Sequence, residues 1–289
     1  MEGQKMLNDF ERIQALIEVL PFIQKLVGHT VVIKYGGSAM TSEILKKKVI
    51  EDILFLSSIG IKPVLVHGGG PIINIWLKKL SIEPKFYNGI RVTDKQTMEI
   101  VEMVLVGKIN KELVMLLNRK TTCAVGLSGK DGNLITASKL FNLENNFVGK
   151  VRNINKQFLT RFLDEGYIPV ITSVAADESG QAYNVNADTV AGAIAKSLQA
   201  EKLVLLTDTL GVMKDINKPN TLFRNLKASD IQKLKQSNII SGGMIPKVES
   251  CIDALEGNVK SAHIIDGRIE HALLLELLTS NGIGSRLTM

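Results

Sequence analysis

Short apolar, β-branched runs alternate with longer amphipathic stretches from Thr30 to the end of the chain. This alternation is typical of βαβ units, which build a mainly parallel sheet with helices packed on it. Glycine or proline marks the limits of several stretches. The pattern predicts strands at 31–34, 63–66, 168–173, 203–207 and 262–265, and helices at 41–58, 71–80, 94–118, 187–197, 243–255 and 271–278.

The section that begins at Cys123 interrupts this alternation. It contains four glycines, at positions 126, 129, 132 and 149, and glycine is unfavourable inside helices but common in turns. We therefore expect strands and hairpins here rather than another helical crossover. No repeat or low-complexity linker divides the 289 residues, so the chain is predicted to form two lobes around one continuous sheet.

The first thirty residues predict a helix of their own. Apolar residues recur at helical spacing, and Pro21 should kink the helix before its apolar face continues. Acidic residues at positions 2, 9, 11 and 18 argue against a signal or transit peptide. The pattern leaves two interpretations open, a helix packed on its own domain or an exposed arm for oligomerisation. The apolar residues are Leu7, Phe10, Ile13, Ile17 and Leu20.

Composition narrows the function classes. Hydrophobic residues make up 45% of the chain, and no apolar run approaches the ~18 residues of a membrane helix. The net charge of +6 suits an anionic ligand, but the lysines are scattered and aromatic residues make up only 5%. We therefore expect neither nucleic acid nor a membrane as a partner. Cys123 and Cys251 lack metal or redox spacing, which predicts reduced core thiols and a reducing compartment.

Two glycine-rich turns follow the first two predicted strands: Lys34-Tyr35-Gly36-Gly37-Ser38 and His67-Gly68-Gly69-Gly70-Pro71. Glycines at the carboxyl end of a strand let the backbone approach a ligand, and the N–H groups that open the next helix attract anions. Both turns should therefore line one crevice. Neither matches the P-loop or the dinucleotide fingerprint, and a glycine pair taken alone is often merely a tight turn.

Lys34 ends an apolar strand, and Lys247 lies just inside a predicted helix behind a second glycine pair, Gly242-Gly243. A charged side chain at the end of a buried strand is costly unless it meets a partner or a phosphate. Phosphoryl transfer depends mainly on positioning and on cancelling negative charge, which two ammonium groups can do together. The glycine contexts favour this interpretation over two solvated surface lysines.

Polar groups also gather where other strands end. Asn184 and Asp188 lie at a strand-to-helix junction, where an amide can bind a substrate and a carboxylate can orient the lysines. A simple helix N-terminal charge is an equally open interpretation of Asp188. Thr207 and Asp208, followed by Gly211, end another strand and suit either a nucleotide or a turn.

Arg91 lies in the segment Asn88-Gly89-Ile90-Arg91-Val92-Thr93, where its planar guanidinium could bind a substrate carboxylate through two hydrogen bonds. A surface arginine is the ordinary alternative. The four histidines show no metal-binding spacing, so no metal ligands are predicted. His67 is interpreted as a turn residue.

These elements, in this order, resemble the amino-acid-kinase superfamily, and five of them resemble its N-acetylglutamate kinase family. The motifs are Lys-x-Gly-Gly, His-Gly-Gly-Gly-Pro, Asn-Gly-x-Arg-Val-Thr, Asn-x-Asn-Ala-Asp, Leu-Thr-Asp and Gly-Gly-Met-x-Pro-Lys. The resemblance covers nearly the whole chain from Thr30 and implies an α/β fold, an open three-layer αβα sandwich. It implies an N-terminal oligomerisation helix at 1–28, an acetylglutamate-binding and dimerising lobe at 29–180, and an ATP-binding lobe at 181–289.

The resemblance also implies a reaction, the transfer of the γ-phosphoryl group of ATP to the γ-carboxylate of N-acetyl-L-glutamate in the second step of arginine biosynthesis. Lys34 and Lys247 match the family's transition-state lysines, and Asp188 matches the acid that organises them. Mg²⁺ would arrive with ATP, without a dedicated protein cage. The matching acetylglutamate contacts are Gly69, Gly70, Arg91 and Asn184, and the nucleotide contacts are Gly36, Gly37, Thr207, Asp208 and Gly211.

The C-terminal segment and the N-terminal helix resemble the arginine-inhibited form of the family. In that form the kinked helix interlaces dimers into a hexamer, and L-arginine binds between this helix and the C-terminal lobe. His263, Glu276 and Gly282 are then the candidate effector contacts, with Glu276 binding the guanidinium. A packed strand histidine and an exposed helix glutamate are the alternatives. The stretch 207–241 departs from the family, because Leu210-Gly211 stands where Asp-Gly often follows Leu-Thr-Asp.

Members of this family in photosynthetic organisms bind the signalling protein PII, and frequent Lys, Ile and Asn suggest an AT-rich genome. PII is therefore a candidate partner, and the expected compartment is the cytoplasm, or the plastid stroma for a plastid gene.

Two other functions stay open. A sister kinase would act on aspartate, glutamate, carbamate or UMP, which the two asparagine motifs argue against. An inactive arginine-sensing subunit would keep the fold, which intact Lys34, Asp188 and Lys247 argue against.

Overall fold

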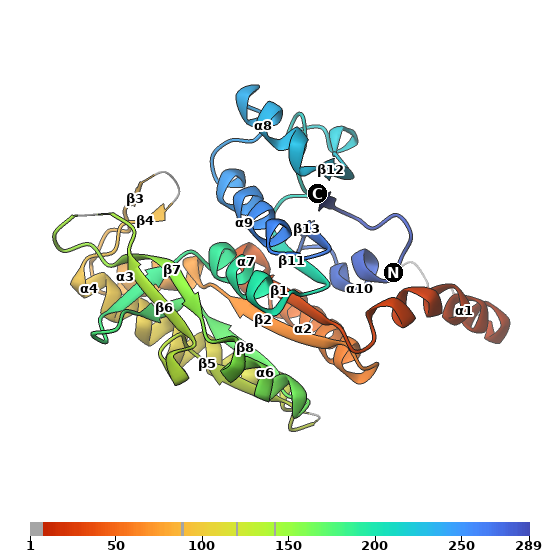
Figure 1. Cartoon of the computed structure of the whole chain (residues 1–289), viewed down its shortest axis with the longest axis horizontal. Coiled ribbons are helices and arrows are strands. Elements are labelled where there is room, and N and C mark those ends of the chain that lie inside the picture. Colours follow the sequence, from red (N-terminus) through yellow and green to blue (C-terminus); the bar gives the residue numbers. More distant parts are fainter. Residues whose placement is uncertain (1–7, 88–89, 120, 142) are drawn as a thin grey trace.

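The computed structural model describes residues 8–87, 90–119, 121–141 and 143–289 (Figure 1). Its centre is an eight-stranded sheet in which neighbours are parallel, except for one antiparallel pair near an edge. In spatial order the strands are β12 (Asn225–Lys227), β14 (Ser285–Thr288), β13 (Ser261–Asp266), β11 (Lys202–Thr207), β1 (Thr30–Tyr35), β2 (Lys62–His67), β8 (Ile168–Thr172) and β5 (Ala124–Leu127). The antiparallel pair is β13 with β14.

Helices cover both faces of this sheet, because alternate residues of a strand point to opposite sides. In β1, Val31 and Ile33 pack into one core, whereas Val32 packs into the other. The first core lies under α2 (Glu43–Ser58), α3 (Gly70–Lys79) and α10 (Ala272–Leu277), and the second lies under α6 (Lys156–Asp164), α7 (Ala187–Leu198), α8 (Ala228–Gln236) and α9 (Met244–Glu256). The predicted three-layer α/β fold with a mainly parallel sheet is confirmed.

The helix predicted at 94–118 is a continuous helical path with a change of geometry in its middle. It begins as α4 (Lys95–Glu102), which Asp94 caps by accepting a hydrogen bond from the N–H of Thr97. It continues as a π-helix, η2 (Met103–Asn110), and ends as α5 (Lys111–Leu117). Each turn of a π-helix holds more residues than an α-helical turn, so the segment changes which residues face the sheet.

The glycine-rich middle section contains the expected hairpin but also a helix that the sequence analysis did not expect. Four short strands, β6 (Ile135–Lys139), β7 (Val148–Ile154), β9 (Val174–Ala176) and β10 (Ala182–Val185), pair into a closed ring. Helix α6 then carries the chain to β8, which is parallel to β5. The expectation of no crossover was wrong, because parallel neighbours cannot be joined by a hairpin.

The C-terminal part also differs from its prediction. The expected final helix is present as α10, but the chain continues into β14, which pairs with β13 on one side and β12 on the other. Helix α8 was not predicted either. A two-stranded hairpin of β3 (Phe86–Tyr87) and β4 (Ile90–Arg91) lies apart from the main sheet, and short 3₁₀ turns lie at Gly37–Met40, Asp131–Asn133 and Pro219–Thr221.

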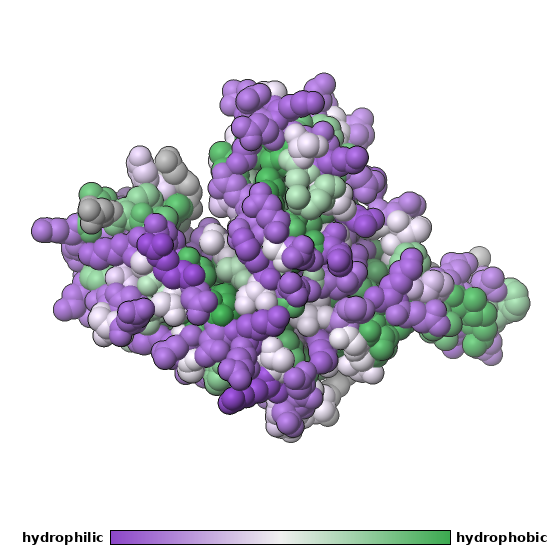
Figure 2. Space-filling view, viewed as in Figure 1, coloured by the Kyte–Doolittle hydropathy of each residue, from purple (hydrophilic) through white to green (hydrophobic). Residues whose placement is uncertain are grey.

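Helix α1 (Asp9–Leu26) projects from the body of the molecule (Figure 1). A capping box between Asn8 and Glu11 begins it, and Pro21 lies inside it, so the predicted kink stays a prediction. Leu26 is buried, but the apolar face before Pro21 does not pack on its own chain: Phe10 is 75% exposed. Figure 2 shows apolar residues gathered on this projecting helix. The other exposed residues of this face are Ile13, Leu16, Ile17 and Leu20, and Leu7 lies outside the described residues.

Within the described ranges, no helix combines the length and the apolar character that crossing a membrane requires.

Candidate active site

The carboxyl ends of β1 and β2 open into a crevice of about 500 Å³. Both glycine turns line it, as predicted, because the two strands are parallel neighbours and end at the same edge of the sheet. Helices α7 and α9 begin at the same place and bring Asp188 and Lys247 into the crevice.

Asp188 holds both predicted lysines. Lys34 Nζ lies 2.9 Å from its Oδ1, and Lys247 Nζ donates to its Oδ2 at 2.8 Å. Burial by itself would raise the pKa of Asp188, but the two ammonium groups lower it to about 2. Burial also lowers the pKa of Lys34, against the opposing effect of Asp188. Two ammonium groups and one carboxylate leave the cluster with an excess of positive charge, which suits a negatively charged reacting group.

Gly36 keeps space for the Lys34 ammonium group. A Cβ atom at this position would lie 2.8 Å from Lys34 Nζ, closer than real Cβ contacts come. Gly37 adopts a φ of +72°, in the left-handed region that favours glycine, and leads into the 3₁₀ turn after β1. The first glycine turn therefore fixes the position of a lysine as well as the path of the backbone.

Arg91 also lines the crevice and comes from the β3–β4 hairpin. Its Nη2 donates to the carbonyl of Gly70 at 3.2 Å and to Oδ1 of Asn74 at 2.6 Å, and its guanidinium lies 4.8 Å from the centre of the Phe86 ring. Burial lowers its pKa to about 10, so it stays charged at neutral pH. Nη1 is buried and has no hydrogen-bond partner among the described residues, which leaves a donor for a ligand carboxylate.

The other predicted acetylglutamate contacts line the same crevice. Gly69 and Gly70 line the crevice between β2 and α3, and Asn184 reaches it from β10. The Asn184 side chain donates to Oγ1 of Thr93 at 3.0 Å, and its carbonyl oxygen has no hydrogen-bond partner within the described part of the chain, so it can accept from a ligand. Asn88 and Gly89, which complete the motif around Arg91, lie outside the described residues.

The five predicted nucleotide contacts are divided between two places. Gly36, Gly37 and Asp208 line the crevice. Gly211 instead lines a separate cavity of about 660 Å³, formed by residues between 209 and 221 and between 237 and 244. Thr207 is buried at the end of β11, where its hydroxyl donates to Asp208 at 3.2 Å, and it lines neither cavity. The structure therefore does not bring Thr207 and Gly211 into the crevice.

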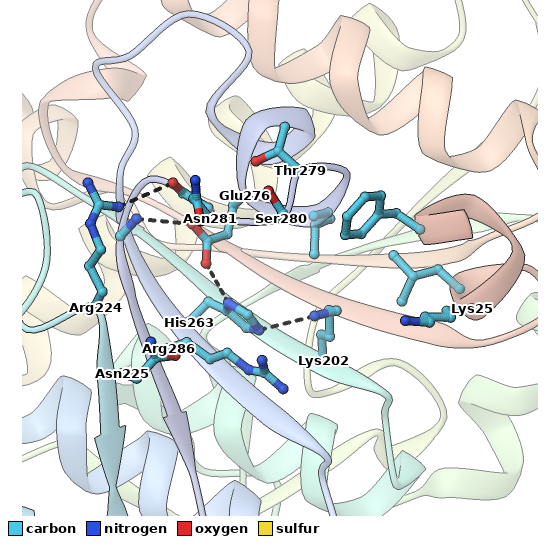
Figure 3. Close-up of a pocket in the computed structure, with 15 residues that line it drawn as sticks. Lys25, Lys202, Arg224, Asn225, His263, Glu276, Thr279, Ser280, Asn281 and Arg286 are labelled. Atoms are coloured by element: carbon cyan, nitrogen blue, oxygen red, sulfur yellow. Dashed lines mark hydrogen bonds and ion pairs between the residues drawn. The ribbon is translucent and has the colours of Figure 1, made fainter. Parts of the chain in front are cut away.

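The three predicted effector residues meet in another pocket, of about 280 Å³, between the end of α1 and the C-terminal strands (Figure 3). His263 Nδ1 lies 2.6 Å from Glu276 Oε1, and the other carboxylate oxygen accepts hydrogen bonds from the N–H groups of Ile283 and Gly284. Gly282 has a φ of +58°, and a Cβ there would lie 2.7 Å from Glu276 Oε2. Glu276 is buried, so the alternative of an exposed helix residue was wrong.

Positive side chains surround this acid. Lys25 comes from α1, Lys202 from β11 and Arg286 from β14, and Arg224 donates to the carbonyl of Gly282 at 3.3 Å (Figure 3). Burial alone would raise the pKa of Glu276, but the hydrogen bond and charge of His263 and the two backbone N–H groups lower it. Glu276 is therefore a carboxylate inside a cationic pocket.

The model of the amino acid kinase family matches residues 29–266. The chain belongs to this family. Relatives of this amino acid kinase carry the name acetylglutamate kinase. The protein from Gracilaria tenuistipitata var. liui is 64% identical over 285 residues, which are 98% of this chain and 100% of the relative. The protein from Thermosynechococcus vestitus is 56% identical over 282 residues, which are 98% and 96% of the two chains.

Solved structures of other family members share the fold. N-acetylglutamate synthase from Neisseria gonorrhoeae, complexed with coenzyme A and N-acetyl-glutamate, is 27% identical with a TM-score of 0.85, covering 96% of this chain and 63% of the synthase. The same synthase complexed with coenzyme A and L-arginine gives a TM-score of 0.77, with 27% identity over 96% of this chain and 65% of the synthase. Carbamate kinase from Giardia lamblia, at 18% identity and a TM-score of 0.65, covers 90% of this chain and 98% of its own and shows the fold alone.

Sequence reasoning missed the charged lining of the effector pocket in this amino acid kinase. Lys202 and His263 belong to neighbouring parallel strands, and the register that pairs Val204 with His263 brings them together. A search for cations near the starts of the predicted strands could have found Lys202. Arg286 could not be found in this way, because β14 was not predicted.

Proposed function

We propose that this kinase transfers the γ-phosphoryl group of ATP to the γ-carboxylate of N-acetyl-L-glutamate, giving N-acetyl-L-glutamyl 5-phosphate and ADP. The observation that carries the proposal is the cluster of Lys34, Asp188 and Lys247 between two glycine turns, in a chain 64% identical to a protein named acetylglutamate kinase. The lobe at 29–180 would bind acetylglutamate, and the lobe at 181–289 would bind ATP.

The reaction needs alignment and charge neutralisation rather than a base. The γ-carboxylate of the acceptor is ionised at neutral pH and is already a nucleophile. Its oxygen forms the new bond to the γ-phosphorus while the bond from that phosphorus to the β–γ bridging oxygen breaks, and ADP leaves with that oxygen. Lys34 and Lys247 neutralise charge on the transferring group, and Asp188 keeps their ammonium groups from moving apart.

Substrate binding follows from the walls of the crevice. Arg91 would bind a carboxylate of acetylglutamate through its unpartnered Nη1, with Gly69, Gly70 and Asn184 completing the site. Gly36, Gly37 and Asp208 would lie against the phosphates of MgATP, in which the metal ion enters with the nucleotide. The cavity that contains Gly211 would hold the nucleoside end of ATP. Thr207 would hold Asp208 in place through the hydrogen bond that its hydroxyl donates.

The test is an ATP-dependent hydroxamate assay on the purified protein, with N-acetyl-L-glutamate, glutamate and aspartate in parallel. We expect product from the acetylated substrate alone. Preference for another acceptor would move the chain to a sister kinase, and turnover of none would support the alternative of an inactive sensor.

A second function is favoured by the pocket in Figure 3: we propose that it binds L-arginine as a feedback inhibitor. The guanidinium of arginine would meet the Glu276 carboxylate beside His263, with Gly282 close to it, and the α-carboxylate would meet the surrounding cations. Running the same assay with and without L-arginine tests this proposal, and an unchanged rate at saturating arginine would contradict it.

We further propose a homohexamer, a trimer of dimers, joined through the exposed apolar face of α1. From the family resemblance alone, we also propose a cytoplasmic or plastid-stromal enzyme with PII as a partner. Sedimentation of the purified protein, alone and with PII, tests both statements. A dimer that never sediments as a hexamer, or no comigration with PII, would contradict the respective proposal.

A further inference from the structure

A buried polar network lies beneath the second glycine turn. His67, the last residue of β2, is 0% exposed and is not among the residues that line the crevice. Its Nδ1 lies 2.9 Å from the carbonyl oxygen of Gly68, and its Nε2 lies 3.2 Å from the side-chain nitrogen of Asn110. Asn110 is the last residue of the π-helix η2 and is 1% exposed. The turn is therefore connected to η2 through one imidazole ring.

The neighbours of Asn110 determine where the proton of His67 lies. The carbonyl of Val170, which can only accept, is 2.8 Å from Asn110 Nδ2, and the ammonium of Lys111, which can only donate, is 3.2 Å from Oδ1. These two contacts fix the orientation of the amide, so Nδ2 donates to His67 Nε2. A neutral ring has one N–H, which must then be at Nδ1, where it donates to the carbonyl of Gly68.

This hydrogen bond controls the direction of the next N–H group. The carbonyl of Gly68 and the N–H of Gly69 belong to one planar trans peptide and point in opposite directions. Holding the carbonyl against His67 therefore turns the Gly69 N–H away from the ring, on the side where Gly69 lines the crevice. That N–H makes no hydrogen bond within the residues that the structure describes, so it is free for a ligand oxygen.

The turn also rests directly on the π-helix. A Cβ atom at Gly69 would collide with the ends of the Ile109 and Leu105 side chains, which would have to shift to admit it. At the far side of Asn110, a Cβ at Gly126 would collide with its Oδ1. π-Helical segments occur frequently at functional sites, because the inserted residue re-aims the side chains that follow. Here the residue that ends the π-helix is Asn110.

We propose that His67 is a positioning residue for phosphoryl transfer, which together with Asn110 fixes the Gly68–Gly69 peptide so that the Gly69 N–H points at an oxygen of the reacting groups. This inference rests on the proposed kinase function and names a role that a turn residue alone would not have. The burial of His67 lowers its pKa to about 4, so the ring stays neutral and keeps its single N–H on Nδ1 at working pH.

Two substitutions separate this role from space filling. In His67→Asn the amide nitrogen takes the place of Nδ1 and can still donate to Gly68, whereas in His67→Gln, which is closer to histidine in size, the amide takes the place of Nε2. We expect kcat/KM for N-acetyl-L-glutamate to stay within about threefold in His67→Asn and to fall about 10- to 100-fold in His67→Gln, with the KM for ATP little changed in both. Equal activities, or the opposite ranking, would overturn the proposal.

The tautomer can be observed without substrate. Solid-state ¹⁵N NMR of the full-length protein labelled at its four histidines gives separate signals for protonated and unprotonated ring nitrogens, and the pair that is absent from the His67→Asn spectrum belongs to His67. We expect a proton on Nδ1 alone between pH 6 and pH 8. An Nε2–H tautomer or an imidazolium in this range would overturn the proposal, whatever the variants do.

The NMR result does not depend on which acceptor the enzyme uses. A wild-type protein that turns over another acceptor would overturn the proposed substrate but not the network, and the kinetic comparison would then be made with that acceptor. Thermal unfolding of both variants shows whether a loss of activity reflects a loss of fold.

Discussion

Two pockets of this protein are each built around one buried carboxylate, and the two carboxylates have different partners. In the crevice, Asp188 pairs with two ammonium groups, Lys34 and Lys247. In the pocket beside α1, Glu276 is held by His263 and by two backbone N–H groups. The first acid is neutralised by fixed cations, whereas the second keeps its negative charge among cations that do not contact it in the described structure.

The comparison shows that the partners of a buried acid decide what it can bind. The two ammonium groups already exceed the negative charge of Asp188, so this carboxylate does not attract another cation. It serves to hold two lysines toward an anionic ligand. Glu276 is hydrogen-bonded by one histidine and two backbone N–H groups and pairs with no lysine or arginine among the described residues, so it can receive a guanidinium.

The largest effect is expected from removing a crevice lysine. Lys247→Ala and Lys34→Ala should each lower kcat by about 100- to 1000-fold, with a smaller change in KM, because their charges act mainly on the transferring group. Steady-state kinetics measures both parameters. Lys196→Ala, which removes an exposed lysine paired with Asp253 in the last turn of α7, is the matched control. A rise in KM at constant kcat would contradict the catalytic role.

Arg91→Ala should raise the KM for N-acetyl-L-glutamate by up to about 100-fold, because hydrogen bonds to a charged group contribute about 1.5–3 kcal/mol. The KM for ATP should change little. Isothermal titration calorimetry with each substrate measures the two affinities separately. Unchanged affinity for the acceptor would remove Arg91 from the substrate site.

Glu276→Gln should raise the arginine concentration needed for half inhibition by about 10-fold or more, since the substitution keeps the size of the side chain and removes its charge. The measurement is the inhibition curve, scaled to the uninhibited rate of the same variant. Glu256→Gln, at an exposed position on the end of α9, is the control. Equal inhibition of both variants would contradict the proposed binding of the arginine guanidinium by Glu276.

Ile17→Glu should shift a hexamer toward dimers and weaken arginine inhibition a few-fold, because it places a charge in the exposed apolar face of α1. Analytical ultracentrifugation and the inhibition curve report the two effects. Ala15→Glu, on the same helix but on the side opposite that face, adds the same charge and should leave both unchanged. A hexamer that persists in Ile17→Glu would contradict the proposal that the apolar face of α1 joins the dimers.

The smallest effect concerns pH. Burial lowers the pKa of Lys34 from its ordinary value of 10.5, so Lys34 loses its proton, and the crevice a positive charge, at a lower pH than an exposed lysine would. On the alkaline side of the pH–rate profile, the rate should therefore begin to fall below pH 10.5. Lys34→Arg should shift this fall to higher pH, because arginine stays charged. The measurement is a pH–rate profile of the wild type and the variant. An alkaline fall at the same pH in both would contradict the assignment of this fall to Lys34.

The strands and helices near the crevice were predictable from the sequence, because each has a local signal. Apolar runs ending in Gly-Gly marked β1 and β2, and Asp94 marked the start of α4. Helix α6 was missed although Phe158, Leu159, Phe162 and Leu163 recur at helical spacing, because the glycines before it suggested hairpins. The change from α4 to the π-helix η2 has no signal of its own in the sequence.

The alternation of elements, the family motifs and the residue types available for chemistry can be read directly from the order of the amino acids. These properties depend on neighbours a few positions apart, where spacing, propensity and turn chemistry act. Which of those residues meet becomes visible in the folded chain: Asp188 between two lysines more than 200 positions apart, Glu276 beside His263, and Asn110 under the turn of His67. Such contacts depend on strand order and helix geometry, which arise from packing the whole chain into one core on each face of the sheet.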